Sequence, residues 1–166
     1  MQKRILSIVC ALVMISSLLM ISSKDVWAFE GEKYDGSYLT MQDSSVGKTH
    51  PEVVTRGKYL MDGECSITKA GRGRIYVYAS TTANTTKVDC LSTVLYVDKF
   101  NENTQKWEQI DFWQVEDRDT YFLSTSKSLA VDRGYYYRVH ATHVVGMDSD
   151  YPYEEATSAT DGIWID

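Results

Sequence analysis

The chain has 166 residues, of which 24% are charged, and its formal net charge of −6 makes it acidic. An acidic protein repels phosphate groups, so nucleic acids and anionic lipid surfaces are not expected partners. The length suffices for one domain with a hydrophobic core, and the charge helps to keep such a domain soluble.

The first residues have the three-part layout of a secretory signal peptide. Lys3 and Arg4 precede an apolar run from Ile5 to about Ile21, and small side chains follow before Ala28. We predict cleavage after Ala28, which leaves a secreted, extracellular protein without a membrane anchor. The alternative is a retained anchor, but two serines interrupt a run that is shorter than the about twenty apolar residues of a spanning helix.

The sequence divides into a signal peptide at 1–28, a flexible N-terminal arm at 29–56 and a β-sandwich domain at 57–166. The arm lacks sustained periodicity and is rich in glycine and small polar residues. After the leader, no stretch keeps a helical period over three turns. We therefore expect no long helix in the mature chain.

Alternating apolar side chains predict the strands of the domain. The clearest stretch follows the Asp132-Arg133-Gly134 turn, where Tyr137, Val139 and their odd-numbered neighbours form one apolar face. Further strands are expected near 63–68, 74–80, 88–98, 107–115, 121–131 and 162–165, with a polar loop from Met147 to Glu155. About seven strands at this spacing predict an all-β fold, an antiparallel β-sandwich.

The predicted strand from Val88 to Asp98 changes phase along its length. Val88 and Cys90 share one parity, whereas Leu91, Leu95 and Val97 share the other. This pattern indicates either a β-bulge or a strand buried on both faces.

Two cysteines remain once the leader is removed, Cys65 and Cys90. An even number in an exported chain predicts a disulfide, which would join either neighbouring strands or the two sheets. The alternative is two buried free thiols. Two cysteines alone are too few for a zinc site.

The run from Asp132 to Val139 resembles the late turn and strand of immunoglobulin-like and fibronectin-like domains. In that pattern, a tyrosine near the start of the strand bonds back to the preceding corner, and Tyr136 occupies its position. Position 138 is Arg rather than the usual second cysteine. The resemblance therefore implies the architecture and not the disulfide of an antibody domain.

A second resemblance extends from Gly63 to the end of the chain. The GECSI opening, the Tyr-Arg-Val-His strand and the closing Thr-Asp-Gly-Ile-Trp-Ile are similar to a family of small exported proteins of Gram-positive, Clostridium-like bacteria. That family is uncharacterised. The resemblance implies location and fold, and it implies no catalytic residues.

Aromatic and cationic side chains suggest a binding surface. If the apolar residues of two predicted strands face inward, the polar ones face outward, and in one sheet they would form a patch for a glycan or an extracellular protein. The alternative is that tyrosine occupies exposed strand positions through its β-propensity. The candidate residues are Tyr76, Tyr78, Tyr136, Arg138 and His140.

No metal or cofactor site is expected. His140 and His143 are three residues apart on one strand and point to opposite faces, which favours one surface and one core histidine. The acidic loop supplies carboxylates that suit calcium, namely Asp148, Asp150, Glu154 and Glu155, but it lacks the EF-hand glycine and spacing. A solvated acidic loop is the preferred interpretation.

These observations favour a secreted, non-enzymatic protein that binds a glycan or a protein surface. No nucleophile elbow or free catalytic cysteine is visible in the sequence. The first alternative is a secreted hydrolase acting on polysaccharide or cell-wall material, which would need two acids, or an acid and a histidine, converging in a cleft. The second is a toxin-like or signalling protein.

Overall fold

A computed structural model gives the structure of residues 32–49, 58–84 and 87–166. The predicted signal peptide, its cleavage after Ala28 and the last part of the predicted arm, 50–56, lie outside these residues. Within the described ranges, no helix has the length and apolar character needed to cross a membrane.

The described residues form strands and one short 3₁₀ helix, η2. Their bounds are β1 (Lys33–Tyr34), β2 (Ser37–Thr40), β3 (Ser44–Lys48), β4 (Leu60–Lys69), β5 (Arg74–Ala83), β6 (Cys90–Asn101), β7 (Lys106–Asp117), β8 (Phe122–Ala130), β9 (Tyr135–Gly146), η2 (Asp148–Asp150), β10 (Glu154–Ala159) and β11 (Gly162–Ile165).

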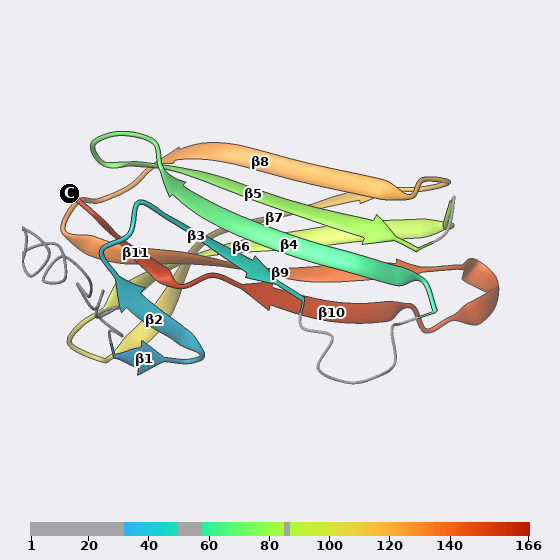
Figure 1. Cartoon of the computed structure of the whole chain (residues 1–166), viewed down its shortest axis with the longest axis horizontal. Coiled ribbons are helices and arrows are strands. Elements are labelled where there is room, and N and C mark those ends of the chain that lie inside the picture. Colours follow the sequence, from blue (N-terminus) through green and yellow to red (C-terminus); the bar gives the residue numbers. More distant parts are fainter. Residues whose placement is uncertain (1–31, 50–57, 85–86) are drawn as a thin grey trace, which may run out of the picture.

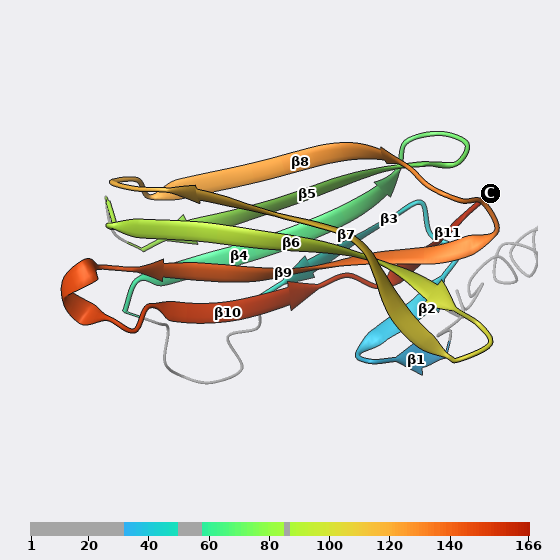
Figure 2. The ribbon, with the colours of Figure 1, turned by 180° about the vertical axis from the view of Figure 1, so that it is seen from behind.

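The strands form two sheets that pack face to face (Figures 1 and 2). One has seven strands in the order β1-β2-β11-β9-β6-β7, and β10 pairs with the same edge of β9 as β11 does. The other has four strands in the order β3-β4-β5-β8. All pairs are antiparallel except β2 with β11. The predicted all-β, two-layer fold is confirmed, but the described residues hold more strands than the seven expected.

The core lies between the two sheets and follows the predicted alternation. Ile75 and Val77 of β5 face Val139 and Ala141 of β9, and all four side chains are fully buried. Burial of side chains of this size contributes roughly 1.5–3 kcal/mol each, so the shared apolar interior holds the sheets together.

The predicted flexible arm is wrong for the part that the structure describes. β1 and β2 extend the seven-stranded sheet beside β11, and β3 extends the four-stranded sheet beside β4. These strands are at most five residues long, and they are held by backbone pairing and by isolated side-chain contacts such as Tyr34 on Phe100, without a repeating apolar face. Periodicity therefore carries no signal for them. The same holds for β10, whose first two residues fall within the loop that the sequence predicts from Met147 to Glu155.

The phase change predicted at the start of β6 is present, and burial on both faces explains it. The residues from Cys90 to Thr93 are all buried, so this end of the strand is covered on both faces. Pairing with β7 then shifts between Val97 and Asp98, where Ile110 of β7 is left without an opposite residue. Such a bulge twists the edge strand locally.

The residue that bonds back to the corner before β9 is Tyr137, not Tyr136 as predicted. The Tyr137 hydroxyl donates to the Asp132 carbonyl oxygen at 2.8 Å. Tyr137 belongs to the inward parity of β9 and is 1% exposed. Tyr136 points to the outer face, where it packs edge-on against Trp164 at a centroid distance of 4.9 Å. The motif spacing was therefore off by one position.

The predicted disulfide between Cys65 and Cys90 is wrong, because both are free, buried thiols. The Cys65 sulfur lies 3.8 Å from the Val139 carbonyl oxygen, and Val139 pairs with Val97 of β6. Seven residues of extended β6 separate Val97 from Cys90, or roughly 23 Å at about 3.3 Å per residue. Bonded cysteines have Cα atoms within about 7 Å of each other.

We predict that Cys65 and Cys90 stay reduced and unreactive in the folded protein. Burial raises the pKa of the Cys65 thiol to about 11, so little nucleophilic thiolate forms at neutral pH. A maleimide should label the peptides that contain Cys65 and Cys90 only after the protein is unfolded in urea. This labelling should need no reductant, because both thiols are already reduced. Peptide mass spectrometry checks this, and a cross-linked peptide containing both cysteines would contradict it.

His143 forms a polar cluster inside the otherwise apolar sandwich. Its side chain is fully buried, with Nδ1 2.7 Å from Thr81 Oγ1 and Nε2 2.8 Å from Ser158 Oγ. Thr81 in turn lies 2.5 Å from the Thr93 hydroxyl. Burial disfavours the imidazolium and lowers the pKa of His143 to about 4. The expected core histidine is thus His143, while His140 faces outward.

We predict that His143 makes folding stability depend on pH between about 6.5 and 4. Because the pKa is lowered in the folded state, the contribution is present above the unfolded pKa of about 6.5 and is lost as the pH falls through 4. The loss should reach at most about 3 kcal/mol. Urea titrations of wild type and His143→Gln at several pH values measure it. The prediction is refuted if the free energy of unfolding changes with pH between 6.5 and 4 to the same extent in both proteins.

Candidate functional site

The predicted five-residue patch is divided between the two sheets. Tyr76 and Tyr78 lie on β5 of the four-stranded sheet, whereas Tyr136, Arg138 and His140 lie on β9 of the seven-stranded sheet. Both sets point outward, so they occupy opposite outer faces of the sandwich (Figures 1 and 2). The alternation correctly indicated which side chains leave the core. It contained no information on which strands are neighbours.

Arg138 is buried on the outer face of its sheet, with only 5% exposure. Its Nε donates to Asp98 Oδ2 at 3.0 Å, and its Nη2 donates to Asp35 Oδ2 at 2.9 Å. Nη1 donates to the Asp35 carbonyl oxygen at 2.8 Å and to Ser37 Oγ at 3.0 Å. The guanidinium also lies 4.6 Å from the centre of the Trp107 ring. Arg138 therefore fastens the β1–β2 turn to β6 and β9.

Asp98 joins this ion pair to His140. The carboxylate is 3% exposed, and the same Oδ2 that accepts from Arg138 lies 3.1 Å from His140 Nδ1. Burial alone would raise the pKa of Asp98. Hydrogen bonds and charge from His140 and Arg138 outweigh burial and hold that pKa below its usual value. Asp98 is therefore ionised at neutral pH and orients both side chains.

His140 ends a column of parallel rings that crosses three strands. Its ring stacks on Tyr96 at 4.6 Å with an interplanar angle of 9°, and Tyr96 stacks on Phe112 at 6.1 Å and 17°. The register explains the column, because Tyr96 pairs with His140 on one side and with Phe112 on the other. Sequence reasoning missed Tyr96 and Phe112. Tyr96 alternates with buried Leu95 and Val97, which was the available signal.

A cavity of about 450 Å³ adjoins the His140 end of this ring column. The next residue in the same cross-strand row is Ala159 of β10, whose small side chain leaves room where a fourth ring would stand. We call this space the His140 cavity. The residues that line it are Asp35, Gly36, Lys48, Arg138, His140, Thr157, Ser158 and Ala159.

Close approach of β3 to β10 brings a lysine to this cavity. A Cβ atom at Gly47 would lie only 2.0 Å from the Ala159 carbonyl oxygen, so a larger residue there would force the strands apart. Lys48 follows directly and pairs with Glu64 at 3.3 Å. The lining of the cavity thus has two basic side chains, Lys48 and Arg138, and one acidic side chain, Asp35. Each basic side chain is paired with a carboxylate, Lys48 with Glu64 and Arg138 with Asp98 and Asp35.

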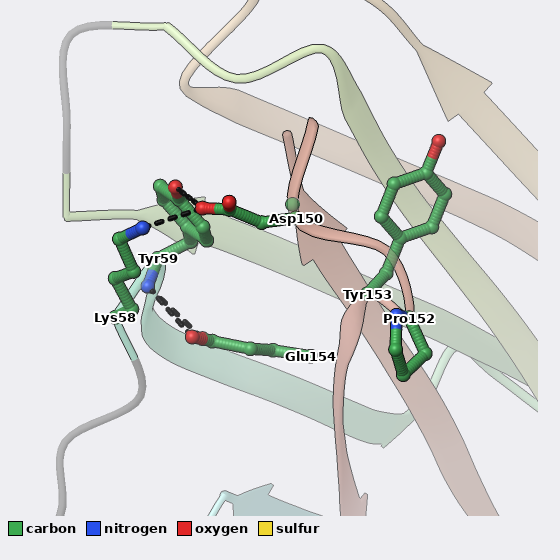
Figure 3. A pocket seen from close by; sticks show the side chains of 7 residues that line it. Lys58, Tyr59, Asp150, Pro152, Tyr153 and Glu154 are labelled. Carbon is green, nitrogen blue, oxygen red and sulfur yellow. Dashed lines mark hydrogen bonds and ion pairs between the residues drawn. The ribbon is translucent and has the colours of Figure 1, made fainter. Parts of the chain in front are cut away.

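A smaller hollow of about 190 Å³ lies beside η2 and is drawn in Figure 3. Its polar groups bind one another. Asp150 accepts from Lys58 and from the Tyr59 hydroxyl, and the Glu154 carboxylate accepts from the backbone N–H groups of Tyr59 and Leu60. The hollow therefore links the start of β4 to β10.

The four carboxylates considered for calcium do not converge. Asp150 and Glu154 face the partners just described, while Asp148 accepts from Arg118 at 2.5 Å and from the Tyr153 hydroxyl at 2.6 Å. Glu155 points outward from β10. Within the described part of the chain, no three His, Cys, Asp or Glu side chains are placed to hold a metal ion. The calcium candidate is therefore not supported.

The fold and the site define a two-sheet β protein with a polar cavity beside His140, at the β10 side of the larger sheet. The family model described as "Family of unknown function (DUF6147)" matches residues 29–161. The chain belongs to this family. No curated protein and no solved structure matches the chain.

We predict that Asp98→Ala destabilises the protein by about 3–5 kcal/mol, because it leaves the buried Arg138 guanidinium without its partner. The matched control is Asp43→Ala, which removes an ion pair with Lys69 at 3.0 Å in which the aspartate is 84% exposed. Asp43→Ala should lower the free energy of unfolding by less than about 1 kcal/mol. Urea unfolding measures both changes, and equal losses would contradict the role given to Asp98.

Proposed function

We propose that the protein is a non-enzymatic binding module that takes a sugar ring of a neutral glycan into the His140 cavity. One observation carries this proposal: a column of three parallel rings stops at His140, beside a cavity at the position of a fourth ring. A pyranose ring offers a flat C–H face for stacking, and the imidazole supplies the matching surface.

The polar rim of the cavity suits the hydroxyl groups of a sugar. Thr157 can both donate and accept, Lys48 and Arg138 donate, and the Asp35 carboxylate accepts. Binding sites of this kind combine a ring surface with a few polar groups that set orientation. Because both basic side chains are already paired with carboxylates, a neutral sugar matches the rim better than an acidic one. A protein ligand would have to insert an aromatic side chain among polar groups.

Export supports the same proposal. Lys3 and Arg4 before an apolar run follow the signal-peptide pattern, and the family match begins at residue 29, directly after the predicted cleavage site. The resemblance to exported proteins of Gram-positive, Clostridium-like bacteria agrees with this location. The ligand would then be a glycan outside the cell.

A secreted hydrolase is the second candidate, because an acid and a histidine do meet at the cavity. Asp98 holds His140 Nδ1, an arrangement that in enzymes leaves the other ring nitrogen to act as acid or base. Asp98 is, however, shared with Arg138, which offsets its charge. The nearby Ser158 hydroxyl turns inward to His143 and is not offered as a nucleophile. These contacts favour binding over catalysis.

We predict that Ala159→Leu, which fills the fourth position of the row, weakens glycan binding at least about tenfold, or about 1.4 kcal/mol. His140→Ala should do the same by removing the stacking surface. Ala70→Leu is the matched control, because Ala70 is also exposed but lies in the turn between β4 and β5. The measurement is calorimetry with soluble oligosaccharides chosen from an array of neutral glycans.

Retained binding in Ala159→Leu, or no binding of the wild type to any neutral glycan, would overturn the proposal. Release of reducing ends that stops in His140→Ala would instead establish the hydrolase.

A further inference from the structure

The outer face of the four-stranded sheet has an unusual composition. Its central positions carry hydroxyl groups in cross-strand rows, in which Tyr78 lies between Ser66 and Ser126, and Tyr76 lies between Thr68 and Ser128. β4, β5 and β8 run side by side in Figure 1, so these rows are contiguous. We call this surface the hydroxyl face, and its residues are Ser66, Thr68, Tyr76, Tyr78, Ser80, Ser124, Ser126 and Ser128.

The hydroxyl face carries no charge, although 24% of the chain is charged. Among the described residues, charged side chains border the face: Glu64 continues the Ser80–Ser124 row and pairs with Lys48, and exposed Arg74 stands at the other end of β5. Large apolar side chains are few and stand apart, since Tyr76 is 43% exposed and exposed Val46 of β3 and Phe122 of β8 lie at the borders. The face is neither a charged patch nor an apolar one.

The hydroxyl groups of this face are not used by the fold. Among the described residues, none of its side-chain hydroxyls has a hydrogen-bond partner within the protein, and neither Tyr76 nor Tyr78 stacks on another ring. Tyr76 and Tyr78 are two positions apart on β5, or roughly 7 Å along the strand. The sheet therefore presents two ring side chains in line, surrounded by groups that can donate and accept.

We propose that the hydroxyl face is a second binding surface, for an extended, uncharged polysaccharide. Anionic polymers require cations that are absent from the described part of this face, and a stable protein interface requires an apolar centre of several anchors. A neutral polysaccharide requires what the face does supply, namely hydroxyl partners and ring side chains at intervals along a line.

The residues of this surface differ from those of the His140 cavity, which lies where β3 meets β9 and β10, and only Lys48 of the cavity lining also borders the hydroxyl face. A chain with both can hold a single sugar unit in the cavity and lie along a polymer with the hydroxyl face. The inference shares its ligand class with the proposed function, but it involves different residues. Each can therefore fail without the other.

The test is sedimentation of the full chain with cellulose and with chitin powders. A solid polymer surface can lie on the hydroxyl face but cannot enter a cavity. Tyr76→Ala/Tyr78→Ala should reduce the bound fraction at least tenfold. Ser126→Glu/Ser128→Glu should do so too, by adding charge while the tyrosines stay in place. Tyr121→Ala is the control, because Tyr121 is 57% exposed but lies outside the rows.

Ala159→Leu separates the two surfaces. It should leave sedimentation with the powders unchanged while it weakens binding of soluble oligosaccharides. The inference is overturned if the wild type does not sediment with either powder. It is also overturned if both hydroxyl-face variants sediment like the wild type, or if Ala159→Leu abolishes sedimentation. If Ala159→Leu leaves soluble binding intact, the proposed function fails instead. Circular dichroism of each variant verifies that it is folded.

Discussion

The register between β6 and β9 is the constraint on which the rest of the molecule depends. It sets Val97 opposite Val139 inside the sandwich, and on the outer face it sets Asp98 opposite Arg138 and Tyr96 opposite His140. A slip of one residue would turn each of these side chains to the other face of the sheet. The apolar core and the outer-face site are therefore specified by the same backbone pairing, and neither can form without the other.

Much of the fold follows from alternation along single strands. Ile75, Val77, Val139 and Ala141 were assigned to the core because each alternates with polar neighbours, and the structure places all four inside. The assembly of strands into sheets is a different matter, since it depends on long-range pairing that no local pattern records. Tyr76 and His140 were therefore predicted to share a surface, although they lie on opposite faces.

The candidate site was predicted only in part, for a related reason. His140 was chosen as an outward-facing residue, but its stacking partners Tyr96 and Phe112 come from two other strands and become visible only with the register. Alternation predicts that Arg138 is exposed, because it is polar and lies on the outward parity of its strand. The β1–β2 segment covers it, and strands of two and four residues are too short to show a periodic signal.

The bulge at Ile110 has a consequence for how the molecule meets copies of itself. β7 is the last strand of its sheet, so its outer row of N–H and C=O groups is open to pairing with a foreign strand. The extra residue interrupts the regular spacing of that row and turns part of it away. With exposed Ile110 and Phe112, a regular edge strand here would be prone to aggregation. An irregular margin of this kind discourages stacking into fibrils at high concentration.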